Sequence, residues 1–119
     1  MISGSCHCGA VRFELIRTPD WLTDCNCSIC RRLGTLWAHA DASDVRLNAA
    51  PGATIAYSWG DHCLAFHSCR TCGCTTHWSS LDDAHPDRMA VNCRLADPSD
   101  IAALQVRRFD GADSWTYLD

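Results

Sequence analysis

Three cysteines lie close together in the stretch CNCSIC at residues 25–30. Cysteine thiolates are common zinc ligands, and one local turn could bring the sulfur atoms of Cys25, Cys27 and Cys30 onto a single metal ion. A structural zinc site uses four protein ligands, whereas a catalytic site keeps one position open for water or substrate. The trio therefore predicts a catalytic zinc site that a substrate can enter.

The charge of such a site indicates the chemistry that it would support. Three thiolates on Zn²⁺ leave a net negative charge, so this zinc is a weaker Lewis acid than zinc held by neutral histidines. A substrate thiol could take the open position as a thiolate and attack a small electrophile such as an aldehyde. We therefore expect a small-molecule thiol and an aldehyde as the reactants.

Two arginines, Arg31 and Arg32, directly follow the trio. Planar guanidinium groups bind carboxylates with paired hydrogen bonds, so both side chains are expected to bind the carboxylates of a peptide-like thiol such as glutathione. The alternative is an ordinary solvated helix face. The chain contains no lysine, which excludes a Schiff-base lysine from any mechanism.

Two further cysteine pairs form a second candidate metal site. Cys6 pairs with Cys8 and Cys69 pairs with Cys72, and a glycine directly follows each pair. Glycine lets the backbone fold tightly enough for its N–H groups to point at thiolate sulfurs. Four thiolates would close a structural zinc site that joins the N-terminal strand to the middle of the chain. The alternative is four reduced, buried cysteines that act as small hydrophobic residues.

The trio also has alternatives. A distant ligand could close it as a second structural zinc site, and a redox sensor could release zinc when the trio is oxidised. The thiol reaction also needs a residue that moves a proton, and His67 and His77 are the histidines nearest the motifs apart from His7. The candidates for a fourth ligand are Cys63, Cys74, Cys93, His67 and His77.

Length and composition fit one domain over residues 1–119. The chain has 119 residues, of which 47% are hydrophobic, and this suits a modest core. The net charge of −4 disfavours nucleic-acid binding, which usually needs a basic surface. The first residues contain neither a signal-like nor a membrane-spanning apolar run, and in a reducing compartment close cysteines favour metal over disulfides. We expect a cytoplasmic protein with no nucleic-acid or membrane partner.

Short strands separated by turns dominate the expected secondary structure. Apolar and polar alternation predicts strands at 10–15, 54–59, 62–67, 75–78, 88–92 and 106–109. One short helix is expected from residue 26 or 28 to 32, ending at Gly34, and another begins at an N-cap on Asp97 and runs through 101–104. Trp37, Trp59 and Trp78 lie in apolar patterns and are expected in the core.

The sequence resembles the glutathione-dependent formaldehyde-activating enzyme family, also called the CENP-V/GFA domain family. The matching segments are GSCHCGAVRFEL at 4–15, CNCSICRRLG at 25–34 and HSCRTCG at 67–73, in the same order and spacing. The resemblance implies a mainly β, zinc-binding fold of the β-tent type with short helices. It also implies a structural zinc at the two cysteine pairs and a catalytic zinc at the trio.

The resemblance further implies a carbon–sulfur lyase activity. Read in reverse, this reaction joins glutathione to formaldehyde and gives S-hydroxymethylglutathione, which agrees with thiol chemistry at a three-thiolate site. The alternative is a non-catalytic, zinc-stabilised module that binds a protein partner, as some β-tent relatives do, with exposed tryptophans as anchors. Cys63, Cys74 and Cys93 fall outside the pattern that the family shares.

Overall fold

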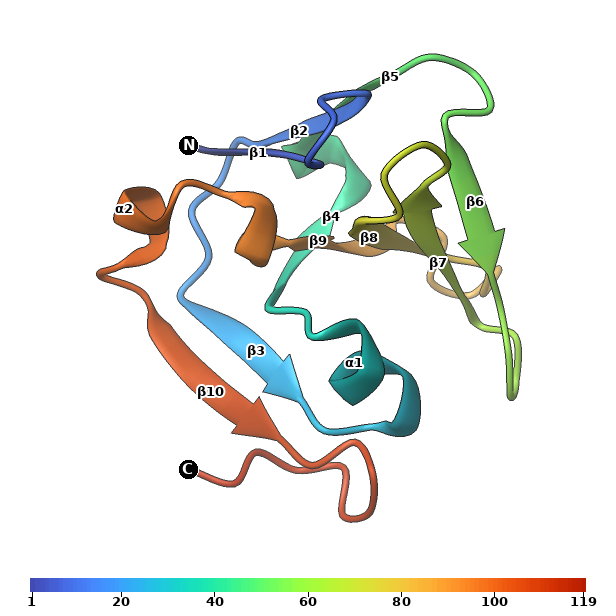
Figure 1. Cartoon of the computed structure of the whole chain (residues 1–119). Coiled ribbons are helices and arrows are strands. Elements are labelled where there is room, and N and C mark those ends of the chain that lie inside the picture. The colour runs from blue at the N-terminus through green and yellow to red at the C-terminus, as the bar shows by residue number, and fades with distance from the viewer.

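Two β-sheets with short helical segments make up the fold (Figure 1). The computed structural model describes residues 1–119. The smaller sheet has the strand order β1-β2-β5, and the larger sheet has the order β10-β3-β4-β9-β8-β7-β6. The strands are β1 (Ile2–Ser5), β2 (Val11–Leu15), β3 (Trp21–Cys25), β4 (Trp37–Asp41), β5 (Val45–Ala49), β6 (Thr54–Tyr57), β7 (Leu64–Cys69), β8 (Thr75–Ser80), β9 (Arg88–Asn92) and β10 (Gln105–Phe109). The helical segments are α1 (Ser28–Leu33), η1 (Ala42–Asp44), η2 (Cys93–Leu95) and α2 (Pro98–Ile101).

The main hydrophobic core joins the two sheets. Its side chains come from β1 and β2 of the small sheet and from β3, β4 and β9 of the large sheet, and they include Ile2, Phe13, Leu15, Leu22, Ala38, Met89 and Val91. Successive residues of a strand point to opposite faces of its sheet. The neighbours of Ala38 and Val91 on β4 and β9 therefore face away from this core.

A second hydrophobic cluster covers that opposite face of the large sheet. It contains Cys30, Trp37, Phe66, Trp78 and Ala90, and the apolar side chains of α1 pack against it. Since Cys30 belongs to α1, the aromatic side chains of the sheet hold the short helix that carries the third cysteine of the trio.

The mainly β class with short helices is confirmed, and most predicted elements are present with shifted ends. The strand expected at 54–59 ends at Tyr57, and its partner runs over Leu64–Cys69 instead of 62–67. Helix α1 ends as predicted at Gly34, which has a φ of 68°. Helix α2 is capped by Asp97 as predicted and ends at Ile101. Residues 102–104 form a turn because the chain must enter β10 beside β3 in parallel.

Four strands have no clear signal in the sequence. Strand β5 has no buried residue, β1 is short, and β3 and β4 mix polar with apolar residues on the same face. The expected burial of Trp59 is wrong: this side chain is 43% exposed, whereas those of Trp37 and Trp78 are 2% and 4% exposed. Trp59 lies beyond the end of β6, the outermost strand of the large sheet, where no neighbouring strand can cover it.

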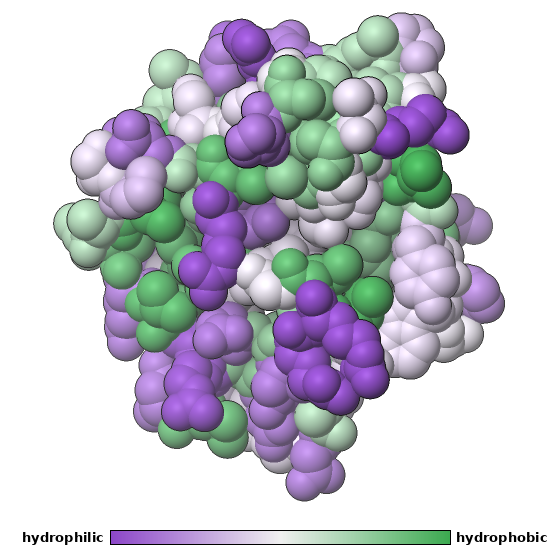
Figure 2. All heavy atoms as spheres, viewed as in Figure 1, coloured by the Kyte–Doolittle hydropathy of each residue, from purple (hydrophilic) through white to green (hydrophobic).

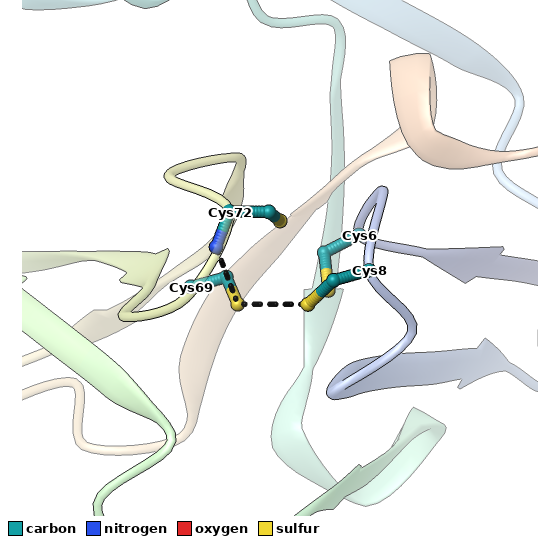
Figure 3. A group of neighbouring side chains, drawn as sticks. All are labelled: Cys6, Cys8, Cys69 and Cys72. Carbon is teal, nitrogen blue, oxygen red and sulfur yellow. Dashed lines mark hydrogen bonds between the residues drawn. The ribbon is translucent and has the colours of Figure 1, made fainter.

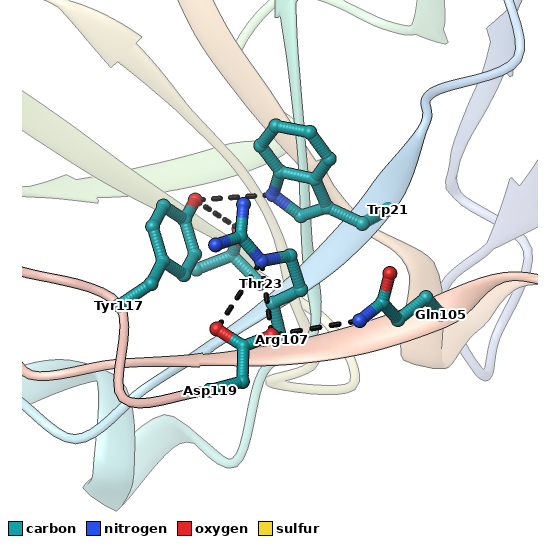
Figure 4. Close-up of polar contacts among 6 residues, drawn as sticks. All are labelled: Trp21, Thr23, Gln105, Arg107, Tyr117 and Asp119. Atoms are coloured by element: carbon teal, nitrogen blue, oxygen red, sulfur yellow. Dashed lines mark hydrogen bonds and ion pairs between the residues drawn. The ribbon is translucent and has the colours of Figure 1, made fainter.

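Residues 110–119 fold back over β3 and β10 (Figure 4). The guanidinium of Arg107 lies 4.6 Å from the centre of the Trp21 ring and 3.9 Å from that of the Tyr117 ring. Its Nε donates to Asp119 at 3.0 Å. The Tyr117 hydroxyl accepts a hydrogen bond from Trp21 Nε1 at 3.1 Å and bonds to Thr23 Oγ1 at 3.0 Å. These contacts attach the C-terminal residues to β3 and β10.

One face of the molecule shows a mixture of side-chain types (Figure 2). Hydrophilic and hydrophobic residues are interspersed over the face shown in Figure 2. None of the helices reaches the length and hydropathy that a segment needs to cross a bilayer.

Replacing Tyr117 with phenylalanine tests the contribution of the C-terminal residues to stability. Tyr117→Phe removes both hydrogen bonds of the hydroxyl while the ring stays against Arg107. Because Trp21 Nε1 then lacks its acceptor, we expect the free energy of unfolding in urea to fall by about 1 kcal/mol. Tyr57→Phe is the matched control, since Tyr57 is 56% exposed. Equal urea midpoints for both variants would show that this network adds nothing.

Candidate metal centres

The two cysteine pairs meet in the structure (Figure 3). Cys6 and Cys8 lie in the turn after β1, and Cys69 and Cys72 lie at the end of β7 and in the turn after it. All four sulfur atoms lie within 4.8 Å of one another, with 3.7 Å between Cys6 and Cys8 and 3.6 Å between Cys8 and Cys69. Two sulfurs on a tetrahedral zinc, each 2.3 Å from the metal, are about 3.8 Å apart. The donor set therefore fits one zinc ion.

Glycine shapes both turns of this four-cysteine cluster. Gly9 and Gly73 have φ values of 84° and 81°, in the region that glycine adopts without strain. The turns direct backbone N–H groups at sulfur: Val11 donates to Cys6 Sγ at 3.2 Å. This agrees with the role that the sequence assigns to the glycine after each pair.

Backbone N–H groups favour the thiolate form at two of the four cysteines, Cys69 and Cys72. Those of Cys74 and Cys8 lower the pKa of Cys72 to about 5, and that of Cys72 lowers the pKa of Cys69. A thiolate is the form that binds metal, so these N–H groups favour the metal-binding form of Cys69 and Cys72, whereas burial and the neighbouring thiols raise the pKa of Cys8 to about 11.

The trio is also brought together, on the other side of the large sheet from the main core. Cys25 ends β3, and Cys27 is the N-cap of α1, where its Sγ accepts a hydrogen bond from the N–H of Cys30 at 3.4 Å. The three sulfurs lie within 4.8 Å of one another. Trp37 Nε1 donates to Cys30 Sγ at 3.3 Å. The trio therefore fits three of the four ligand positions of a tetrahedral zinc ion.

The pKa values of two thiols in the trio, those of Cys25 and Cys30, shift in opposite directions. A hydrogen bond from Cys30 lowers the pKa of Cys25 to about 6, although burial opposes the shift. The same interaction, followed by burial, raises the pKa of Cys30 far above its ordinary value. One thiolate is therefore stable at neutral pH without metal, whereas three adjacent thiolates repel one another and need a cation.

None of the five expected fourth ligands joins the trio. The cluster of ligand atoms within 4.8 Å of one another contains Cys25, Cys27 and Cys30 alone. Cys74 packs against the four-cysteine cluster, and Cys93 lies in the main core. His67 and His77 stack on each other with their ring centres 4.2 Å apart. Cys63 lines the cavity in front of the trio without joining it.

A cavity of about 600 Å³ opens beside the trio, and its volume is typical of small-molecule sites. Most of its wall is apolar, with aromatic side chains from the sheet and from the C-terminal residues: Trp37, Phe66, Trp78, Phe109, Trp115 and Tyr117. Polar and charged side chains are fewer: Thr23, His39, Asp61, Asp82 and Arg88. A second cavity of about 420 Å³ adjoins it and shares His39, Trp78 and Arg88.

Arg31 and Arg32 do not line either cavity. Both are exposed on α1, and Arg32 Nη1 donates to the carbonyl of Ser28 at 2.7 Å. The arginine that lines both cavities is Arg88 on β9, whose guanidinium lies 5.9 Å from the centre of the Trp78 ring. Both Arg31 and Arg32 therefore lie on an exposed face of α1, and their role in binding a carboxylate stays a prediction.

Sequence reasoning missed Arg88 and His39 because both are remote from the cysteine motifs in the chain. The available signal is weak. Arg88 begins a predicted strand, and His39 follows Trp37 at the two-residue spacing that places both on one face of a strand.

Gly111 gives a test of how tightly the trio is held. A Cβ added there would lie 2.6 Å from Cys25 Sγ and 3.0 Å from Cys27 Cβ. We expect Gly111→Ala to displace these cysteines and to weaken zinc binding at the trio about tenfold, as supporting residues of metal sites do when altered. Ala112→Ser adds one heavy atom at the next, exposed position and is the matched control. A competition titration with a chelator measures both affinities, and equal values would show that Gly111 does not constrain the trio.

Comparisons with known proteins agree with these motifs. The family model described as glutathione-dependent formaldehyde-activating enzyme matches residues 1–109. A Halomonas elongata relative whose name refers to the same enzyme is 52% identical over 33 residues, which are 27% of this chain and 21% of the relative. The match thus spans about a fifth of that curated relative's length.

A solved structure shares the fold. The crystal structure of a Rhodobacter sphaeroides protein matches with a TM-score of 0.70 and 32% identity, over 87% of this chain and 98% of that one. The mainly β fold expected from the resemblance is thereby supported by an independent structure. With the match to the family model over residues 1–109, these findings show that this chain belongs to the glutathione-dependent formaldehyde-activating enzyme family.

Proposed function

We propose that this chain acts as a single domain and as a zinc-dependent carbon–sulfur lyase on an adduct of a small thiol and an aldehyde, with glutathione and formaldehyde as the pair. One observation carries the proposal: three convergent cysteine sulfurs have a cavity beside them and no fourth protein ligand. A closed structural site needs a fourth ligand, whereas a catalytic one keeps that position for substrate. Membership of the family supports the same reaction.

The two cysteine sets have different roles in this proposal. Cys25, Cys27 and Cys30 hold the catalytic zinc, which when bound lowers the pKa of a substrate thiol and fixes the position of its sulfur. The structural zinc is held by Cys6, Cys8, Cys69 and Cys72. Trp37 donates to Cys30 Sγ, which fixes the orientation of that ligand and reduces its negative charge.

The cavity supplies the remaining binding groups. Its aromatic wall excludes water from the small aldehyde, and Arg88 is the one arginine that lines it. Arg88 forms no ion pair within the chain, so its guanidinium is available for a carboxylate of glutathione. We place the reaction in the cytoplasm, because none of the ten cysteines forms a disulfide and a reducing compartment keeps cysteines available as metal ligands.

A protein-binding module of the β-tent type is the second candidate. Trp115 is 73% exposed and Trp59 is 43% exposed, and both belong to the cavity wall. Exposed tryptophans are frequent anchors of protein interfaces. In this alternative, zinc stabilises the fold and no thiol enters the trio.

Zinc content and lability separate the two candidates. For the enzyme we expect two zinc ions per chain, of which one exchanges readily and changes its coordination when glutathione is added. Cobalt substitution makes that change visible in the absorption spectrum. Two inert sites that do not respond to glutathione would leave the binding module as the function.

Two serine variants assign the sites. Cys27→Ser should remove the labile metal and leave the fold intact, whereas Cys72→Ser should unfold the domain, because structural zinc contributes directly to folding. Circular dichroism and metal analysis measure both effects. The opposite pattern would mean that the two roles are reversed.

The proposed role of Arg88 in binding a carboxylate of glutathione can be tested by measuring the KM for glutathione. A charge-assisted hydrogen bond contributes about 1.5 kcal/mol or more, so Arg88→Gln should raise the KM for glutathione about tenfold and leave that for the uncharged thiol 2-mercaptoethanol unchanged. Arg46→Gln is the control, since Arg46 is exposed on the small sheet. If Arg31→Gln or Arg32→Gln raises the KM for glutathione and Arg88→Gln does not, the carboxylate of glutathione binds to α1, as the sequence predicts.

A further inference from the structure

We infer that His39 is the proton-transfer residue of this site: its imidazole takes the proton of the substrate thiol and returns it to the oxygen of the adduct. The inference rests on the proposed function. It assigns a role that sequence proximity gives to His67 or His77.

The position of His39 follows from strand geometry. His39 and Trp37 are two residues apart on β4, so their side chains share one face of the sheet and lie about 7 Å apart along the strand. Trp37 contacts the trio through its hydrogen bond to Cys30. Both side chains line the cavity beside the trio. His39 therefore lies next to Trp37 in the cavity wall, and Trp37 contacts the sulfur atom of Cys30.

The ring nitrogens of His39 are free, in contrast to those of the two histidines near the motifs. His67 bonds to Thr54 Oγ1 at 3.3 Å and to Ser79 Oγ at 2.9 Å, and it stacks on His77. Neither of these two rings lines the cavity. His39 is the one histidine that does, its side chain is exposed, and it makes no hydrogen bond within the chain.

The surroundings of His39 favour its neutral form. Its ring meets Trp78 edge-on with the ring centres 5.9 Å apart, and Arg88 lies over the same tryptophan. Although His39 is exposed, partial loss of water around its ring, followed by the positive charge of Arg88, lowers the pKa of His39. An imidazole neutral at pH 7 can accept a proton. The other charged or titratable side chains that line the two cavities are Arg17, Asp20, Asp41, Asp44, Asp61, Asp82, Cys63, Tyr117 and the three cysteines of the trio.

The proposed step balances in atoms and charge. The S–H bond of the thiol breaks, and its proton moves to His39, which becomes an imidazolium. The thiolate attacks the carbon of formaldehyde, so a C–S bond forms and the π electron pair of the carbonyl moves to oxygen. The imidazolium then protonates that oxygen, which gives the S-hydroxymethyl thioether and restores neutral His39. The lyase direction runs through the same transfers in reverse.

His39→Gln tests this role, with His85→Gln as the matched control because His85 is exposed and lines neither cavity. We expect His39→Gln to lower the enzymatic rate about 10²-fold, after subtraction of the spontaneous reaction, while zinc content and the thermal midpoint stay unchanged. The control should keep the full rate.

The pH profile gives a readout that a structural role would not move. Since neutral His39 is the active form, the rate of adduct formation should fall as the pH drops through the pKa of His39. Metal loss at low pH affects all variants alike, so comparing the pH profiles of His39→Gln and His85→Gln isolates the fall in rate that protonation of His39 causes. This fall should be absent from the profile of His39→Gln.

Binding provides a readout independent of activity. In the zinc-loaded protein, glutathione should shift the NMR signals of the His39 ring and leave those of His67 and His77 in place. If wild-type protein is active and His39→Gln is equally active with the same pH profile, the inference is wrong and the proposed function stands. If wild-type protein shows neither activity nor a response of the trio to glutathione, the proposed function itself fails.

Discussion

Repulsion between neighbouring thiolates is the main physical constraint on the two cysteine groups of this molecule. Four sulfurs within 4.8 Å of one another, and three in a second group, can all be ionised only around a cation. The four-cysteine cluster spans the turn after β1 and the turn after β7, so it connects the small sheet to the large one. The small sheet is therefore joined to the large one at two places, the main hydrophobic core and this cluster.

The same ligand type gives two different environments because of where the chain turns. The four cysteines come from two glycine-containing turns that face each other, which completes a tetrahedral set. The trio comes from one strand end and the first turn of α1, and aromatic residues of the sheet fill the space behind it. The remaining side is a cavity wall. Strand β4 contributes both the tryptophan behind the trio and the histidine of the proposed proton transfer.

The cysteine sets could be predicted from local sequence patterns. The cavity could not, because it depends on the pairing of strands that are far apart in the chain. Spacing and the following glycines identify Cys6, Cys8, Cys69 and Cys72 as one group, and helix α1 could be placed from its ends. The position of Arg88 beside the trio depends on the pairing of β9 with β4 and β8, which no local pattern specifies. Because Arg31 and Arg32 follow the trio in the chain, the sequence predicted that they bind the carboxylates of the thiol, yet both side chains are exposed on α1. The exposure of Trp59 likewise follows from the position of β6 at the sheet edge.

The C-terminal residues add a wall that carries no metal ligand. Phe109, Trp115 and Tyr117 line the cavity, and Gly111 packs against Cys25. Arg107 and Asp119 anchor this segment to the sheet. Substitutions of Phe109, Trp115 or Tyr117 would reshape the cavity without removing a cysteine of either set. The shape of the cavity and the ability of the chain to hold metal are therefore set by different residues, so one can change without the other.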